Sequence, residues 1–62
     1  MRSMLKTLRK AHGLTQTQLA QRARVPQSYI ASLEGGRKTN PSLVVLRRLA
    51  KALGTTIGAL VE

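Results

Sequence analysis

The sequence predicts an all-α fold: a compact domain of five short helices that spans residues 1–62. Two observations lead to this prediction. Apolar residues recur at helical spacing along the chain, and no segment alternates between apolar and polar residues over the length of a strand. Glycines and an Asn-Pro pair then divide the chain into pieces of helical length.

The first helix is expected over residues 3–11, with Met4 or Leu5 and Leu8 facing inward. Gly13 follows it, where a left-handed residue commonly ends a helix. The chain has no Phe or Trp, so its core must be built from Leu, Ile, Val, Ala and Met. A domain of this length buries only about 60% of its unfolded surface and is marginally stable.

The second and third helices are predicted to form a helix-turn-helix. Thr15 caps the second helix, Gln18 completes a capping box, and the helix ends near Ala23. The third begins at Pro26 or Gln27. The apolar positions of this segment are Leu19, Ala20, Ala23, Val25, Ile30 and Leu33. Because the connection is short, the two helices must cross at a steep angle, which leaves the far side of the third helix free.

The remaining helices follow two paired signals. The third helix is expected to end at Gly35-Gly36, and Asn40-Pro41 is expected to open the fourth, with Asn as N-cap and Pro as the first helical residue. The predicted apolar stripe of the fourth helix comprises Leu43, Leu46, Leu49, Ala50 and Leu53, and Gly54 ends the helix. A last short helix is expected after Thr56, carrying Ile57, Leu60 and Val61.

The charge indicates a polyanionic partner. Eleven Lys and Arg stand against two acidic residues, which gives a formal net charge of +9. Nucleic acid is the commonest partner of so basic a domain, with acidic lipid headgroups as the competing class. The basic residues are spread along the chain, and no apolar run approaches the ~18 residues of a membrane span. With no signal peptide recognised, a cytoplasmic protein associated with the nucleoid is expected.

Enzyme chemistry and metal binding are not expected. The chain has no Asp, no Cys, one His and two Glu, so it offers neither an acid–base pair nor an activated nucleophile. The same composition offers no metal site, and no cofactor is expected.

Base reading is assigned to the free side of the third helix. The candidates are Gln27, Ser28, Ala31 and Ser32. The first turn of a helix that enters the major groove end-on presents its side chains to base edges. Glutamine can bond adenine N6 and N7 together, serine adapts to several bases, and Ala31 could touch a thymine methyl. The alternative is that these are ordinary solvated residues.

Phosphate binding is assigned to residues that flank this helix. The candidates are Gln16, Tyr29, Arg37, Lys38 and Asn40. Gln16 sits at the amino end of a helix, where free N–H groups favour an anion. The loop that follows the third helix would position the domain without reading sequence. For Tyr29, partial burial against the first helix or the following loop is an equal alternative.

Five runs together resemble the lambda-repressor-like, or Cro-type, helix-turn-helix family. They are GLTQTQLA (13–20), VPQSYI (25–30), LEGG (33–36), NPSL (40–43) and LAKALG (49–54). The resemblance implies that Gln16 braces Gln27 and that Glu34 forms a structural ion pair with Arg9. This chain has Arg24 where many members have Gly, at a cost of order 1 kcal/mol.

The resemblance implies a sequence-specific double-stranded DNA-binding regulator, with repression as the simplest action. Because one module reads few base pairs, a homodimer on a palindromic operator is expected, with half-sites about one turn, ~34 Å, apart. Ile57, Leu60 and Val61 are the predicted dimer surface. The alternatives are a small RNA- or ribosome-binding protein, which the lack of stacking aromatics disfavours, and the antitoxin of a toxin pair.

Overall fold

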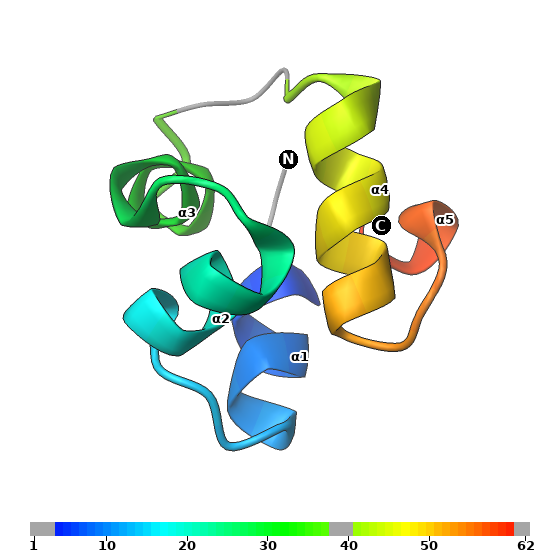
Figure 1. Ribbon diagram of the computed structural model, residues 1–62, viewed down its shortest axis with the longest axis horizontal. Coiled ribbons are helices and arrows are strands. Elements are labelled where there is room, and N and C mark those ends of the chain that lie inside the picture. The colour runs from blue at the N-terminus through cyan, green and yellow to red at the C-terminus, as the bar shows by residue number, and fades with distance from the viewer. Residues whose placement is uncertain (1–3, 38–40, 61–62) are drawn as a thin grey trace.

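The five predicted helices are present in a computed structural model, which describes residues 4–37 and 41–60. They are α1 (Met4–Ala11), α2 (Gln16–Ala23), α3 (Gln27–Glu34), α4 (Leu43–Ala52) and α5 (Ile57–Leu60). The described residues contain no strand, so the predicted all-α fold is confirmed. Figure 1 shows α3 and α4 on opposite sides, with α2 between them. None of these helices is long and apolar enough to cross a membrane.

Local chemistry sets the start of α2. The Thr15 hydroxyl accepts a hydrogen bond from the Gln18 backbone N–H at 3.0 Å, and Gln18 Oε1 accepts one from the Thr15 backbone N–H at 2.9 Å. This is the reciprocal capping box that the sequence predicts, and it satisfies two N–H groups that would otherwise lack partners. Before it, α1 ends at Ala11, and Gly13, the predicted stop, follows in the turn with a left-handed φ of 67°.

Arg24 holds the turn between α2 and α3 in a left-handed conformation, with φ 58° and ψ 46°. Its backbone N–H and that of Val25 both reach the carbonyl of Ala20, so the turn is closed by main-chain hydrogen bonds. Such a conformation costs a residue with a Cβ roughly 1–2 kcal/mol, a cost that glycine avoids. The turn therefore keeps the geometry typical of glycine while it carries a cation.

We expect Arg24→Gly to raise the free energy of unfolding by about 0.5–1 kcal/mol. Relief of the left-handed strain stabilises the folded state, and the greater freedom of glycine in the unfolded chain offsets part of that gain. Urea unfolding followed by circular dichroism measures the difference. Arg22→Gly, in the last turn of α2, is the control and should destabilise the domain. Destabilisation by Arg24→Gly would mean that the arginine side chain contributes more than its backbone costs.

The start of α4 differs from the sequence-based expectation. Ser42, not Asn40, is the N-cap: its hydroxyl accepts a hydrogen bond from the Val45 backbone N–H at 3.2 Å. Pro41 therefore precedes the helix instead of opening it, and Asn40 lies outside the described residues. Serine is as strong a cap as asparagine, and here the later of the two candidates is used.

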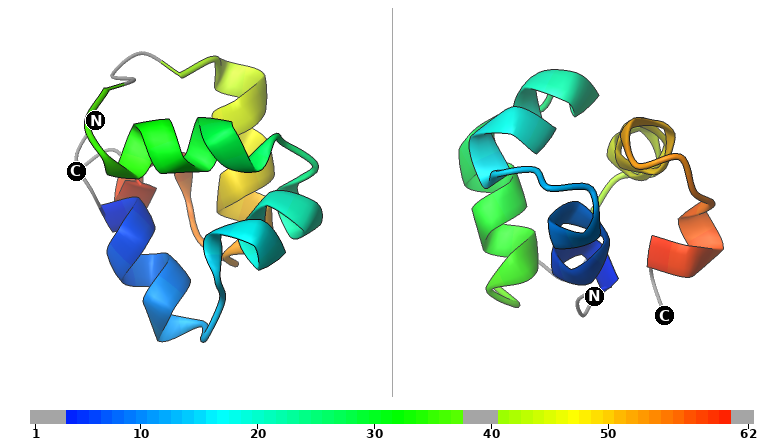
Figure 2. Two further views of the ribbon diagram at one scale, coloured as in Figure 1. Left: turned by 90° about the vertical axis from the view of Figure 1, so that its left-hand side faces the viewer. Right: turned by 90° about the horizontal axis from the view of Figure 1, so that it is seen from below.

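The core lies between the five helices. Its buried apolar members are Leu5, Leu14, Leu19, Ala20, Ala23, Val25, Ile30, Leu33, Leu49, Ala50, Leu53 and Leu60. The helix α2 packs against α3 and α4, while α1 packs against α3 and α5. Figure 2 shows α3 lying across the front of this assembly, with its outer side uncovered.

Two apolar assignments are wrong. Leu43, which the sequence places in the inward stripe of α4, is 54% exposed. On the helix Leu43 lies only about 20° from the buried Ala50, so its direction does not account for its exposure. Leu43 and the equally exposed Val44 form the first turn of α4, and the buried residues of this helix, Leu49 and Ala50, lie in its second half. Leu60, predicted at a dimer surface, is instead fully buried in the core of its own chain.

Candidate nucleic-acid interface

The first turn of α3 presents polar side chains to solvent. Gln27 and Ser28 are exposed, while Ala31 and Ser32, one turn further on, are half-buried. Pro26 precedes the helix in an extended conformation and provides no side-chain cap. The backbone N–H groups that open α3 therefore lack a side-chain cap from Pro26, beside the two exposed polar residues.

An ion pair joins α1 to the end of α3. Arg9 Nε lies 2.6 Å from Glu34 Oε2, and Arg9 Nη2 lies 2.9 Å from Glu34 Oε1. The remaining arm of the guanidinium, Nη1, donates to the Leu14 carbonyl at 2.7 Å. Arg9 is only 8% exposed, yet both of its terminal nitrogens have acceptors. The ion pair that the family resemblance implies is thus present, as a bidentate pair at the edge of the core.

Opposing effects act on the Glu34 carboxyl. Burial raises its pKa, whereas hydrogen bonds from Arg9 and Gln16 and the charges of Arg9 and Lys6 lower it, and the lowering effects prevail. The hydrogen bond to Glu34 raises the pKa of Arg9 in turn, against the opposing effect of burial. Both groups are therefore held in their charged forms.

Gln16 extends this ion pair to the start of α3. Its Nε2 donates to Glu34 Oε1 at 3.1 Å, and its Oε1 accepts from Gln27 Nε2 at 2.9 Å. An ionised carboxylate only accepts hydrogen bonds, so Gln16 must turn its NH2 group toward Glu34 and its oxygen toward Gln27. Gln27 must then face Gln16 with its own NH2 group. The charge on Glu34 consequently sets the orientation of both amides.

Tyr29 matches the alternative of partial burial. It packs half-buried against the core, and its hydroxyl oxygen accepts a hydrogen bond from the Ser42 backbone N–H at 3.3 Å. Tyr29 thereby ties α3 to the segment that caps α4.

Of the predicted phosphate-binding loop, the structure describes only its beginning. Arg37 is exposed, and its backbone N–H donates to the Ser32 carbonyl at 3.0 Å, which holds the chain close to the end of α3. Lys38 and Asn40 lie outside the described residues, as does Val61 of the predicted dimer surface. Ile57 of that surface is half-buried against the core.

Sequence reasoning missed two features. One is the hydrogen bond from Gln16 to Glu34, which joins residues far apart in the chain. The other is a basic hollow between α2 and α4, to which Arg48 and Lys51 contribute. Their spacing of three residues places them on one helix face, but nothing in the sequence shows that the end of α2 lies opposite. Within residues 4–37 and 41–60, no cluster of His, Cys, Asp or Glu could hold a metal ion.

Comparisons with known proteins agree with this geometry. A helix-turn-helix family model matches residues 5–60. An immunity repressor of Bacillus phage phi105 is 46% identical over 57 residues, which are 92% of this chain and 39% of that protein. An uncharacterised HTH-type transcriptional regulator of Methanothermobacter thermautotrophicus is 46% identical over 87% of this chain and 77% of its own length. The chain thus spans well under half of the phage relative.

A solved structure is also similar. The crystal structure of a restriction-modification controller protein from Aeromonas hydrophila superposes with a TM-score of 0.83 at 38% identity. The superposition covers 89% of this chain and 82% of that one.

Proposed function

Because the chain belongs to the lambda-repressor-like helix-turn-helix family of DNA-binding transcription regulators, we propose that it reads a specific duplex sequence with the first turn of α3. The observation that supports this most is the exposed Gln27 amide, whose orientation is set by Gln16 and ultimately by Glu34. A reading group held in one orientation loses little freedom on binding, which favours affinity.

The orientation of Gln27 suits adenine. One N–H of its amide is engaged by Gln16, so the second N–H and the carbonyl oxygen are left to pair with N7 and N6 of adenine in the major groove. Ser28 and Ser32 would contact neighbouring bases, and Ala31 would allow close approach to a thymine methyl.

Phosphate contacts would flank this reading surface. Gln16 opens α2, where backbone N–H groups and the helix dipole attract an anion. Arg37 stands beyond the other end of α3, and Lys38 and Asn40 follow it in the sequence. Contacts at both ends would position α3 along the groove without selecting bases.

We further propose that the protein binds a palindromic operator as a homodimer. Bound there, in the cytoplasm, it would repress transcription by blocking polymerase. The molecule measures 23 × 22 × 19 Å, so two copies side by side can place their α3 helices about 34 Å apart. Since Leu60 is buried, the contact needs other apolar residues. Leu43 and Val44, adjacent on α4, are the most exposed large apolar side chains among the described residues and are our candidates.

Gln27→Ala tests the reading assignment. Duplexes bound by the protein are first selected from a random library, and affinities are then measured for the selected duplex and for its single-base variants. We expect Gln27→Ala to lose about 1–3 kcal/mol of binding free energy on the selected duplex and to relax the base preference at one or two positions of the site. Arg37→Ala, the control, should weaken binding to all duplexes alike. It should also reduce by about one the slope of the logarithm of the binding constant against the logarithm of the salt concentration. An equal loss of specific and random binding in Gln27→Ala would refute the assignment.

A further inference from the structure

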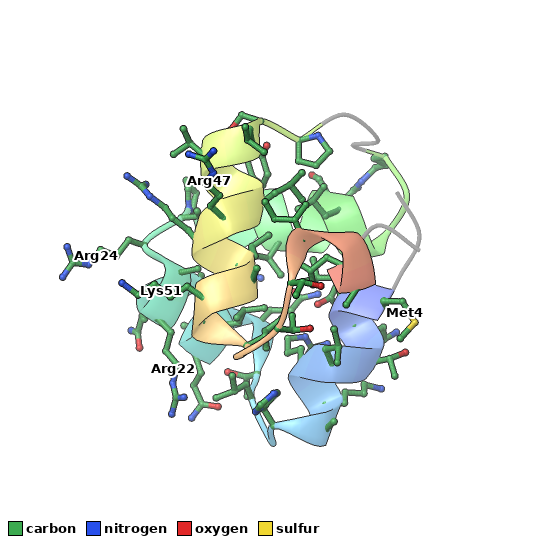
Figure 3. The ribbon with its side chains drawn as sticks, turned by 90° about the vertical axis from the view of Figure 1, so that its right-hand side faces the viewer. Met4, Arg22, Arg24, Arg47 and Lys51 are labelled. Atoms are coloured by element: carbon green, nitrogen blue, oxygen red, sulfur yellow. The ribbon has the colours of Figure 1, made fainter. Side chains whose placement is uncertain are left out.

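A basic hollow lies between the end of α2 and the second half of α4, outside the reading surface. Its volume is about 560 Å³, and it is lined by Arg22, Ala23, Arg24, Arg48, Lys51 and Ala52. Figure 3 shows Arg22, Arg24 and Lys51 at one edge of the molecule, seen from the α4 and α5 side with α3 behind. The proposed function uses none of these four cations.

The charge of this hollow is uncompensated by its own lining. Four of the six lining residues are cationic and none is acidic. Glu34, the one acidic residue among those that the structure describes, is engaged by Arg9 and Gln16 away from the hollow. Like charges held together on two helices repel one another, and an anion between them relieves that repulsion.

The hollow is also partly preorganised. Arg48 Nη1 donates to the Arg24 carbonyl at 3.3 Å and so bridges α4 to the turn after α2. The small side chains of Ala23 and Ala52 leave the space open between the longer cations. Three of the four cations are arginines, whose planar forks pair with carboxylates through two parallel hydrogen bonds.

We propose that this hollow binds an acidic segment of a protein partner, with carboxylate side chains paired to Arg22, Arg24, Arg48 and Lys51. The first turn of α3, which we propose reads DNA, contributes no residue to this hollow. Single-stranded nucleic acid favours grooves with stacking aromatics, and no aromatic residue lines this one. An extended peptide fits the space, and its methylene groups can rest on the two alanines.

The hollow and the reading turn of α3 use different residues. Binding of the partner therefore requires none of the side chains that we propose read DNA. The proposal goes beyond the assignment of DNA reading and does not depend on it, because its test uses no DNA sequence.

Fluorescence anisotropy with a short labelled peptide of alternating glutamate and alanine tests the proposal on the full chain. The double variant Arg22→Glu/Lys51→Glu changes one cation on each side of the hollow. Lys10→Glu/Arg47→Glu makes the same change in net charge at two exposed positions that do not line it. We expect the first variant to bind the peptide about tenfold more weakly, equivalent to ~1.4 kcal/mol, and the second to bind it nearly as the parent does.

Four outcomes would overturn the proposal. Equal losses in the two double variants would mean that only net charge matters. Tighter binding of a thymidine oligonucleotide, with the same dependence on Arg22 and Lys51, would identify the occupant as nucleic acid. No binding of the glutamate peptide by the parent, or equal binding of a glutamine–alanine peptide, would show that the hollow does not recognise carboxylates. Circular dichroism of each variant checks that it is folded.

Discussion

Replacing Leu60 with aspartate should unfold the domain. Leu60 is fully buried where α5 packs against α1 and α4. Truncation of a buried leucine to alanine alone costs about 2–5 kcal/mol, and a carboxylate placed there must also be desolvated without a partner. A domain of this size has only roughly 3–9 kcal/mol of stability in total. Circular dichroism and thermal unfolding should therefore show little or no folded protein at 25 °C.

Val44→Asp is the matched control for Leu60→Asp. Val44 is 56% exposed in the first turn of α4, where an acidic side chain also interacts favourably with the helix dipole. This variant should stay folded and lose operator affinity only through weaker association of two copies, which sedimentation would detect. A folded, monomeric Leu60→Asp protein would instead return α5 to the dimer surface and contradict its place in the core.

The features that the sequence predicts well depend on neighbouring residues. Thr15 and Gln18 form their capping box from chemistry within three positions, and Gly13 ends α1 through its own backbone freedom. The start of the third helix was narrowed to Pro26 or Gln27, because proline is tolerated at the beginning of a helix, and the structure places Pro26 at the N-cap. Such signals need no knowledge of the rest of the fold.

The features that the sequence leaves undecided depend on tertiary packing. Leu43 and Leu60 are equally apolar and both lie at the end of a helix, but one is exposed and the other fully buried. Asn40 and Ser42 are equally good caps, and the choice between them coincides with the hydrogen bond from Ser42 to Tyr29. The basic hollow exists only because α2 and α4 pack together. The ion pair of Arg9 and Glu34 was inferred from the family resemblance, since 25 positions separate the two residues.

Removing the Glu34 carboxylate should be the most damaging polar substitution in the domain. Glu34→Ala leaves the Arg9 guanidinium at the edge of the core with only the Leu14 carbonyl as a described partner. Breaking a buried pair costs about 3–5 kcal/mol, and partial exposure places the expected cost near the lower limit of that range. Arg9→Met/Glu34→Leu should cost less than Glu34→Ala, because it leaves no uncompensated charge. If the double variant lost more unfolding free energy than Glu34→Ala, the ion pair would stabilise the fold by more than the neutralisation of a buried charge.

The pH dependence of this loss follows from the lowered pKa of Glu34. Because the pKa in the folded state lies below the unfolded value near 4.5, the ionised carboxylate contributes stability that is fully present above about pH 4.5. That stability is lost as the pH falls through the folded-state pKa, while Arg9, with its raised pKa, stays charged. The difference in unfolding free energy between the parent and Glu34→Ala should thus be constant near neutral pH and shrink in acid. With only two acidic residues in the chain, the parent offers few other carboxyl groups to titrate in that range. A difference that persists unchanged at pH ~2 would show that the lost stability comes from packing of the side chain and not from its charge.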